Sequence, residues 1–301
     1  MNCIFSVDVE DWFHILDVPA TPRMSEWQSL PSRVEMNFRK LLDLFSANNV
    51  KSTCFFLGWV AEKYPHLVKE ASALGHEVAS HGYSHTLIYK MSPEEFDRDI
   101  RRSKQILEDI SGQEVIGYRA PGFSVTAKTP WFFEKLAGAG YRYDSSVFPA
   151  RREHGGMAAS PCSPHAIHES SSHSLIEFPM SVVEILSTRL CLFGGGYLRL
   201  FPWGLTRMMA SRVMAEGRPV IFYVHPREID PGHPRLPMGV VRAFKSYVNL
   251  KTTQAKVERI LAEFEVTTFR RFMEEHWNVF ACSPVSGFTP AVRARAAAGS
   301  T

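Results

Sequence analysis

The sequence has little of what marks a secreted or disulfide-stabilised protein. Its cysteines are few, odd in number, widely separated and without a CxxC pair: Cys3, Cys54, Cys162, Cys191 and Cys282. This pattern favours free thiols in a reducing compartment over a disulfide framework. The opening residues, MNCIFSVDVEDWF, lack the basic segment and long apolar segment of a signal peptide. Together these absences predict a cytoplasmic protein.

Long hydrophobic runs and a charge imbalance are also missing. No stretch approaches the roughly 18 consecutive apolar residues of a membrane-spanning helix. Lys and Arg number 34 against 31 Asp and Glu, a formal net charge of +3 spread along the chain. A nucleic-acid-binding protein would normally gather its basic residues on one face. The sequence therefore predicts no membrane span and no nucleic-acid partner, and it gives no indication of an oligomeric state.

The chain does contain a regular alternation of strand-like and helix-like segments. Short apolar runs typical of strands occupy residues 3–9, 52–58, 76–81, 115–121, 175–185 and 219–225. Apolar residues at helical spacing fill the segments between them, at 33–50, 60–75, 92–112, 129–140 and 203–217. Strands that alternate with helices predict parallel βαβ units. Right-handed crossovers then give an α/β fold, either an open doubly wound sheet or a barrel.

Local signals also mark where the regular elements begin and end. Ser92 and Glu95 form the expected capping box of one helix, with Pro93 in its first turn and Gly112 after its last. The alternation fails between Phe148 and Leu175, where the composition predicts a long loop. Its histidines are expected to be solvated: His154, His165, His168 and His173. Residues 278–301 are expected to form a weakly ordered tail.

Acidic and basic side chains follow several of the expected strands. Asp8, Glu10 and Asp11 follow the first, and His81 and His85 follow the strand at 76–81. Arg119 and His225 follow two later strands. In a barrel the carboxyl ends of the strands meet at one mouth, where catalytic groups of such folds lie. The sequence therefore predicts one site assembled from four strand ends.

His81 and His85 are four residues apart, so both imidazoles can reach one metal ion. An isolated HxxxH is more often a surface pair, but an acid from DVED would complete the His–His–carboxylate set of hydrolytic zinc sites. We expect one divalent ion, most readily Zn²⁺. Asp11 is favoured as the third ligand, since the turn after the strand could bring it inward. Glu10 is the alternative, because strand alternation puts it on the face of Asp8.

Five motifs together resemble those of polysaccharide deacetylases of the NodB-homology type. They are FSVDVED, HEVASHGYSH, YRAPGFS, YRYDSS and FYVHP, and the resemblance covers roughly residues 3–275. Four stretches, VDVEDWF, GGGYLRLFP, YVHPREIDP and SYVNLKTTQAKVERIL, resemble more narrowly the exopolysaccharide-locus (PEP-CTERM/exosortase-associated) subfamily. The sequence departs from the family in having Asp-Val-Glu-Asp where adjacent aspartates are usual.

The resemblance implies a distorted (β/α) barrel of about seven strands with its active site at the C-terminal strand ends. It implies one deacetylase domain over residues 1–277, of which about 235–277 is a subfamily-specific segment. The implied activity is metal-dependent removal of N-acetyl groups from an amino sugar in a surface-glycan or exopolysaccharide pathway. Hydrolysis of another cyclic or small amide on the same barrel is an alternative, as is a non-catalytic glycan-binding protein.

The resemblance also implies a role for each side chain. Asp8 is expected to be the general base, with Arg119 holding it ionised and oriented. His225 is expected to protonate the departing amine, with Asp144 orienting its imidazole. Trp12, with Phe13 and His14, could form a wall against the sugar or pack in the core. Tyr197, after a run of three glycines, could also contact substrate.

Overall fold

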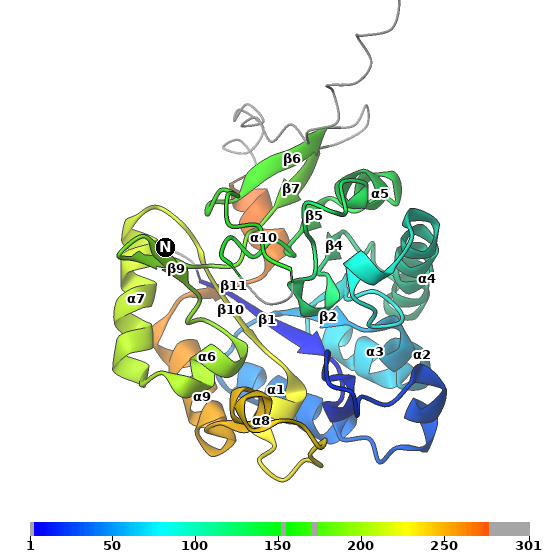
Figure 1. The fold of residues 1–301 in the computed structure, drawn as a ribbon, viewed down its shortest axis with the longest axis horizontal. Coiled ribbons are helices and arrows are strands. Elements are labelled where there is room, and N and C mark those ends of the chain that lie inside the picture. The colour runs from blue at the N-terminus through cyan, green and yellow to red at the C-terminus, as the bar shows by residue number, and fades with distance from the viewer. Residues whose placement is uncertain (1–2, 152–154, 170–173, 277–301) are drawn as a thin grey trace, which may run out of the picture.

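A curled, mostly parallel sheet forms the centre of the molecule (Figure 1). The computed structural model describes residues 3–151, 155–169 and 174–276. The sheet has nine strands and the order β10-β1-β2-β3-β4-β5-β7-β6, with β11 pairing the start of β1. The strands are β1 (Cys3–Val9), β2 (Thr53–Phe56), β3 (Glu77–Ser80), β4 (Gly117–Tyr118), β5 (Tyr143–Asp144), β6 (His165–Glu169), β7 (Ser174–Glu177), β10 (Val220–Val224) and β11 (Val266–Thr267). The expected α/β fold is confirmed.

Helices lie around the outside of this sheet, as Figure 1 shows for α1, α3, α4, α7 and α9. The helices are α1 (Val34–Ala47), α2 (Gly58–Lys63), α3 (Pro65–Ala73), α4 (Pro93–Ser111), α5 (Phe132–Gly138), α6 (Gly195–Leu200), α7 (Trp203–Ala215), α8 (Val240–Tyr247), α9 (Thr253–Glu263) and α10 (Phe269–Glu275). A separate hairpin joins β8 (Val183–Ile185) and β9 (Thr188–Leu190). None of the helices in the described ranges has both the length and the apolar character to cross a membrane.

The predicted ends of α4 are confirmed, but other boundaries differ. Ser92 and Glu95 form the capping box, and Gly112 ends the helix with a φ of 68°. The helix expected at 60–75 is instead two helices, because a residue before proline disfavours helical geometry and Pro65 starts α3. The loop expected between Phe148 and Leu175 contains one strand, β6, which pairs antiparallel with β7 at the start of the strand expected at 175–185. A short strand inside a Ser- and Pro-rich segment lacks the periodicity that would reveal it. The tail expected at 278–301 lies outside the described residues.

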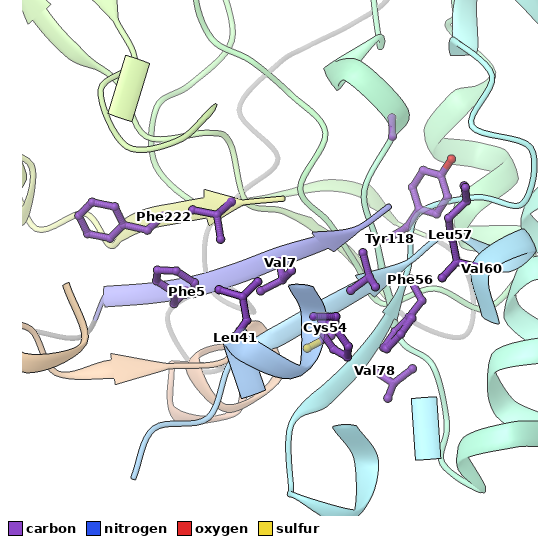
Figure 2. Close-up of a cluster of buried hydrophobic side chains, with 14 of the residues drawn as sticks. Phe5, Val7, Leu41, Cys54, Phe56, Leu57, Val60, Val78, Tyr118 and Phe222 are labelled. Carbon is purple, nitrogen blue, oxygen red and sulfur yellow. The ribbon is translucent and has the colours of Figure 1, made fainter. Parts of the chain in front are cut away.

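Side chains alternate between the two faces of β1. Cys3, Phe5, Val7 and Val9 belong to the core between the sheet and the outer helices. Figure 2 shows Phe5 and Val7 in this cluster with Leu41 of α1 and Cys54 and Phe56 of β2. Ile4 belongs instead to a second core inside the curl of the sheet. Because the period of a strand is two, Ser6, Asp8 and Glu10 share the inner face with Ile4.

Helix α10 packs into the inner core from the C-terminal end of the described chain. Phe269, Phe272 and Met273 belong to the same buried cluster as Phe55 and Tyr143. The rings of Tyr143 and Phe269 stack with centroids 5.3 Å apart. The Tyr143 hydroxyl donates a hydrogen bond of 2.8 Å to Glu77 Oε1. Side chains therefore fill the inside of the curl near the amino-terminal ends of β2 and β3. The polar groups gather at the carboxyl ends of the strands.

Gly117→Ala is expected to destabilise the protein by about 1–3 kcal/mol, the usual cost of overpacking a core. A Cβ atom at Gly117 would meet the Tyr143 ring at 2.0 Å, and that ring is fixed between neighbours. Denaturant unfolding measures the change. Gly204→Ala on α7 is the matched control, because a Cβ there meets no atom within 4 Å. Equal stability of the two variants would show that the inner core accommodates the added methyl group without a loss of stability.

Candidate active site

The carboxyl ends of the central strands meet at a cleft of about 550 Å³. In the sheet Val7 pairs with Val224, so Asp8 and Glu10 lie beside His225, which follows β10. Asp8, Glu10, His81, His85 and His225 all line the cleft. Asp8 and Glu10 are each at most 3% exposed. The structure thus brings together side chains that sequence spacing could only suggest were neighbours.

Glu10, His81 and His85 form a group that could hold a metal ion. Each offers one ligand atom, and these atoms lie within 4.8 Å of one another. His81 Nδ1 lies 2.8 Å from the carbonyl oxygen of Arg119, so its Nε2 is the nitrogen left for an ion. Burial, together with the neighbouring His85, lowers the pKa of His81 to about 3. His81 is therefore neutral at physiological pH, as a metal ligand must be.

Glu10 carries the negative charge of this group. Burial alone would raise its pKa, but the imidazoles of His85 and His225 hold the pKa of Glu10 well below its usual value. Its Oε2 atom lies 2.5 Å from His85 Nε2. The contact joins the carboxylate to a nitrogen of a histidine in the same buried group. A bound cation would take the carboxylate oxygen and the imidazole nitrogen as ligands in place of this contact.

Asp11 does not lie in this group, so the preference for Asp11 over Glu10 is corrected. Its side chain caps the short helix Trp12–His14 and accepts a bond of 2.8 Å from the Trp12 N–H. Asp11 also accepts hydrogen bonds from the segment before α1, namely from Ser32 Oγ and the backbone N–H groups of Arg33 and Val34. These contacts use both oxygens of the carboxylate, and Asp11 does not line the cleft.

Asp8 forms a buried ion pair with Arg119. Arg119 Nη1 lies 2.7 Å from Asp8 Oδ1, and the two side chains are 0% and 2% exposed. The same Nη1 donates to Ser6 Oγ at 2.8 Å, and the guanidinium lies 4.2 Å from the centre of the Phe55 ring. These contacts fix the position of Asp8 and leave its Oδ2 facing the cleft, 3.8 Å from His225 Nε2.

Glu228, and not Asp144, is the carboxylate beside the imidazole of His225. Glu228 Oε2 lies 3.2 Å from His225 Nδ1 and accepts a bond of 3.0 Å from the His225 backbone N–H. Glu228 is also in a buried contact with Arg199. Burial lowers the pKa of His225 to about 4, although Glu10 opposes the shift. The short helix Pro226–Ile229 after β10 sets this arrangement.

Asp144 lies deeper in the sheet and contacts other groups. It accepts a hydrogen bond of 2.5 Å from Ser146 Oγ, and Glu177 is its carboxyl neighbour. Burial raises the pKa of Asp144 to about 6. The expected contact from Asp144 to His225 is therefore wrong. Glu228 is three residues after His225, at the spacing of a capping box in a short helix. That spacing is the signal in the sequence that could have revealed the contact.

Two further sequence predictions concerned residues that contact a sugar. Trp12 is 6% exposed, donates from Nε1 to the carbonyl of Pro31, and packs in the core, so it does not line the cleft. Tyr197 does line the cleft and is 48% exposed. His14 lines it as well, and its Nδ1 accepts the Asp11 N–H, so the ring proton is on Nε2. That buried N–H has no partner in the described ranges.

Two family models match separate segments of the chain. Residues 29–143 match the family model described as "Polysaccharide deacetylase". Residues 145–274 match "Domain of unknown function (DUF3473)". Over residues 29–143 the chain is therefore similar to polysaccharide deacetylases, in agreement with the resemblance of its motifs. The first match holds His81, His85 and Arg119, whereas Asp8 and Glu10 precede it and His225 falls in the second.

Curated relatives match over short segments. A peptidoglycan-N-acetylglucosamine deacetylase of Bacillus cereus is 38% identical over 73 residues, 24% of this chain and 26% of the relative. A peptidoglycan deacetylase of Helicobacter pylori is 30% identical over 113 residues, 38% of each chain. The chain therefore spans well under half the length of these relatives.

Solved structures match over almost the whole chain. A Mycobacterium smegmatis protein described as a polysaccharide deacetylase has a TM-score of 0.65 at 18% identity, covering 96% of this chain and 94% of that one. Puue allantoinase has a TM-score of 0.58 at 17% identity, with coverages of 92% and 90%. At such identities the likeness concerns the fold alone, and it supports the NodB-type architecture.

Proposed function

We propose that the protein is a metal-dependent hydrolase that removes N-acetyl groups from an amino sugar. The main support is the group of Glu10, His81 and His85 next to the buried pair of Asp8 and Arg119. The similarity of residues 29–143 to polysaccharide deacetylases supports the same chemistry, as do relatives whose names state deacetylation of peptidoglycan. The complete set of polar groups argues against a protein that only binds glycans.

The residues present fit a divalent ion such as Zn²⁺. Two imidazoles and one carboxylate are a usual ligand set for catalytic zinc, with a further position left for water. The hydrogen bond from His81 Nδ1 to the Arg119 carbonyl is the outer contact that commonly orients a ligand imidazole. When bound, the ion would polarise the acetamide carbonyl and make a water molecule more acidic.

The remaining side chains supply proton transfer and orientation. Asp8, held by Arg119, would take a proton from the attacking water through its Oδ2. His225 lies next to Asp8 and Glu10, and in its protonated form it would give its Nε2 proton to the departing amine and become neutral. Glu228 would hold the imidazole through Nδ1, leaving Nε2 directed at the substrate. The His14 Nε2–H is free to donate a hydrogen bond within the cleft.

The proposed substrate is an N-acetylated sugar of a surface glycan or exopolysaccharide. The narrower assignment to an exopolysaccharide pathway is supported by the resemblance of GGGYLRLFP and YVHPREIDP to that subfamily. Both stretches contribute to the site: Tyr197 and Arg199 come from the first, and His225 and Glu228 come from the second. Their resemblance therefore concerns residues that line the cleft and not a remote part of the surface.

Acetate release from N-acetylglucosamine oligosaccharides tests the proposal. We expect release that stops after chelation and returns when Zn²⁺ is added, and His81→Ala should abolish it. His66→Ala is the matched control, since His66 lies on α3 with its side chain 46% exposed. Allantoin serves as the comparison substrate. Consumption of allantoin without acetate release from any N-acetylated sugar would replace this proposal with cyclic-amide hydrolysis.

A further inference from the structure

Positively charged side chains are among those that line the cleft. Four of them come from the segment 199–245: Arg199, Arg227, Arg242 and Lys245. Arg199 is neutralised within the protein, since it contacts Glu228 and donates to the carbonyls of Lys245, Ser246 and Val248. Its charge is therefore already used in holding the site together.

Arg227 has no comparable partner. Its side chain is 11% exposed, and the nearest carboxylate oxygen, Glu10 Oε1, lies 3.9 Å from its Nε. Nε and Nη1 of Arg227 are buried and have no hydrogen-bond partner in the described part of the chain. Glu10 is shared with His85 and His225, so it does not satisfy the guanidinium. A buried cation with unfilled donors is a costly arrangement in a protein that binds nothing there.

Arg242 is in a similar position beside it. Its Nη2 donates to the Leu16 carbonyl at 2.6 Å, while its buried Nε has no partner among the described residues. Arg227 and Arg242 both line the cleft, and each has a buried donor without a hydrogen-bond partner in the described ranges. Two guanidinium groups at one cleft are an arrangement that binds a carboxylate or phosphate.

We propose that Arg227 and Arg242 form an anion subsite beside the catalytic group, so that the substrate is an N-acetylated sugar bearing a phosphate or carboxylate. This inference rests on the proposed function and names its substrate class. Arg227 Nε and His225 Nε2 each lie within 4 Å of Glu10 Oε1, at 3.9 and 3.6 Å. The anionic group therefore belongs to the acetylated sugar itself or to the group directly linked to it.

Binding of three probes that share one sugar tests the subsite by calorimetry. They are N-acetylglucosamine 1-phosphate, N-acetylmuramic acid, and neutral methyl N-acetylglucosaminide. We expect the better of the two anionic probes to bind at least about tenfold more tightly than the neutral one, equivalent to about 1.4 kcal/mol. Whichever anion binds better tells phosphate from carboxylate. The preference should weaken as salt is added.

The double variant Arg227→Gln/Arg242→Gln should reduce the preference to within about twofold, and Arg212→Gln, which alters an exposed arginine of α7, should leave it intact. Arg242→Gln alone gives a partial loss if the double variant folds poorly. The measurements use zinc-loaded and chelated protein, because an anion bound only by the metal would be insensitive to both arginines.

An anion preference that is absent, or that survives the double substitution, would overturn the subsite. The subsite and the proposed function can fail separately. Efficient acetate release from the neutral sugar, with no gain from either anion, would leave deacetylation standing and remove the subsite. An arginine-dependent anion preference without acetate release from any probe would keep the subsite and contradict the proposed function.

Discussion

Glu10→Gln protein is expected to lose its divalent metal, while Asp11→Asn protein keeps it. The Glu10 carboxylate lies within 4.8 Å of the ligand nitrogens of His81 and His85 and carries the negative charge of the group. A neutral amide removes that charge and leaves two imidazoles only. Metal affinity should fall by more than the roughly 10–100-fold typical of losing an outer-shell partner. Acetate release should fall with it.

Competition with a chelator of known affinity measures this loss, and elemental analysis after dialysis confirms it. Asp11→Asn is the matched control because it makes the same chemical change one residue away. Asp11 caps a short helix and binds the segment before α1, so its loss should cost about 0.5–2 kcal/mol of stability. If Asp11→Asn lost the metal and Glu10→Gln retained it, the ligand assignment would have to be reversed.

His225→Ala is expected to lower the turnover of an N-acetylated sugar by about 10²–10⁴, the usual contribution of a general acid. An amine leaves poorly without a proton, and His225 Nε2 faces the cleft beside Asp8 and Glu10. The loss should be much smaller with 4-nitrophenyl acetate, whose leaving group departs without a proton. Metal content should be unchanged. Equal losses on both substrates would assign His225 to binding or structure.

Glu228→Gln is the companion variant to His225→Ala. Glutamine keeps an acceptor for the Nδ1 proton but removes the charge, and the charged bond is stronger by about 1 kcal/mol. We expect a loss of roughly fivefold on the amide substrate, which is the rate effect of about 1 kcal/mol. Wild-type turnover in this variant would mean that the contact of 3.2 Å between Glu228 Oε2 and His225 Nδ1 does not support the acid.

Much of this site could be predicted from the sequence, because the alternation along a strand decides to which face of the sheet each side chain points. Asp8 and Glu10 alternate with Val7 and Val9, so the two acids had to share a face once the strand was recognised. The error at Asp11 has a different origin. Its carboxylate is held by Ser32, Arg33 and Val34, and no local pattern predicts which distant segment folds against a strand end.

The remaining errors also concern contacts between distant segments. Glu228 lies near His225 because a tight turn joins them. Asp144 was expected in that role only because of the family resemblance, and its neighbours are Ser146 and Glu177. Arg227 and Arg242 are ordinary basic residues in the sequence. Their significance comes from burial without partners, which only the folded chain reveals. Alternation thus predicted the framework, and tertiary packing decided the individual partners.

The position of β1 indicates that the two segments matched by family models, residues 29–143 and 145–274, depend on each other for their structure. β1 pairs with β2 on one side and with β10, from the second segment, on the other. A break near residue 144 would leave Asp8, Glu10 and both histidines on one fragment and His225 on the other. The first fragment would also expose the edge of β1, and an exposed strand edge promotes aggregation. A protein that lacked either segment would therefore lack part of the candidate active site.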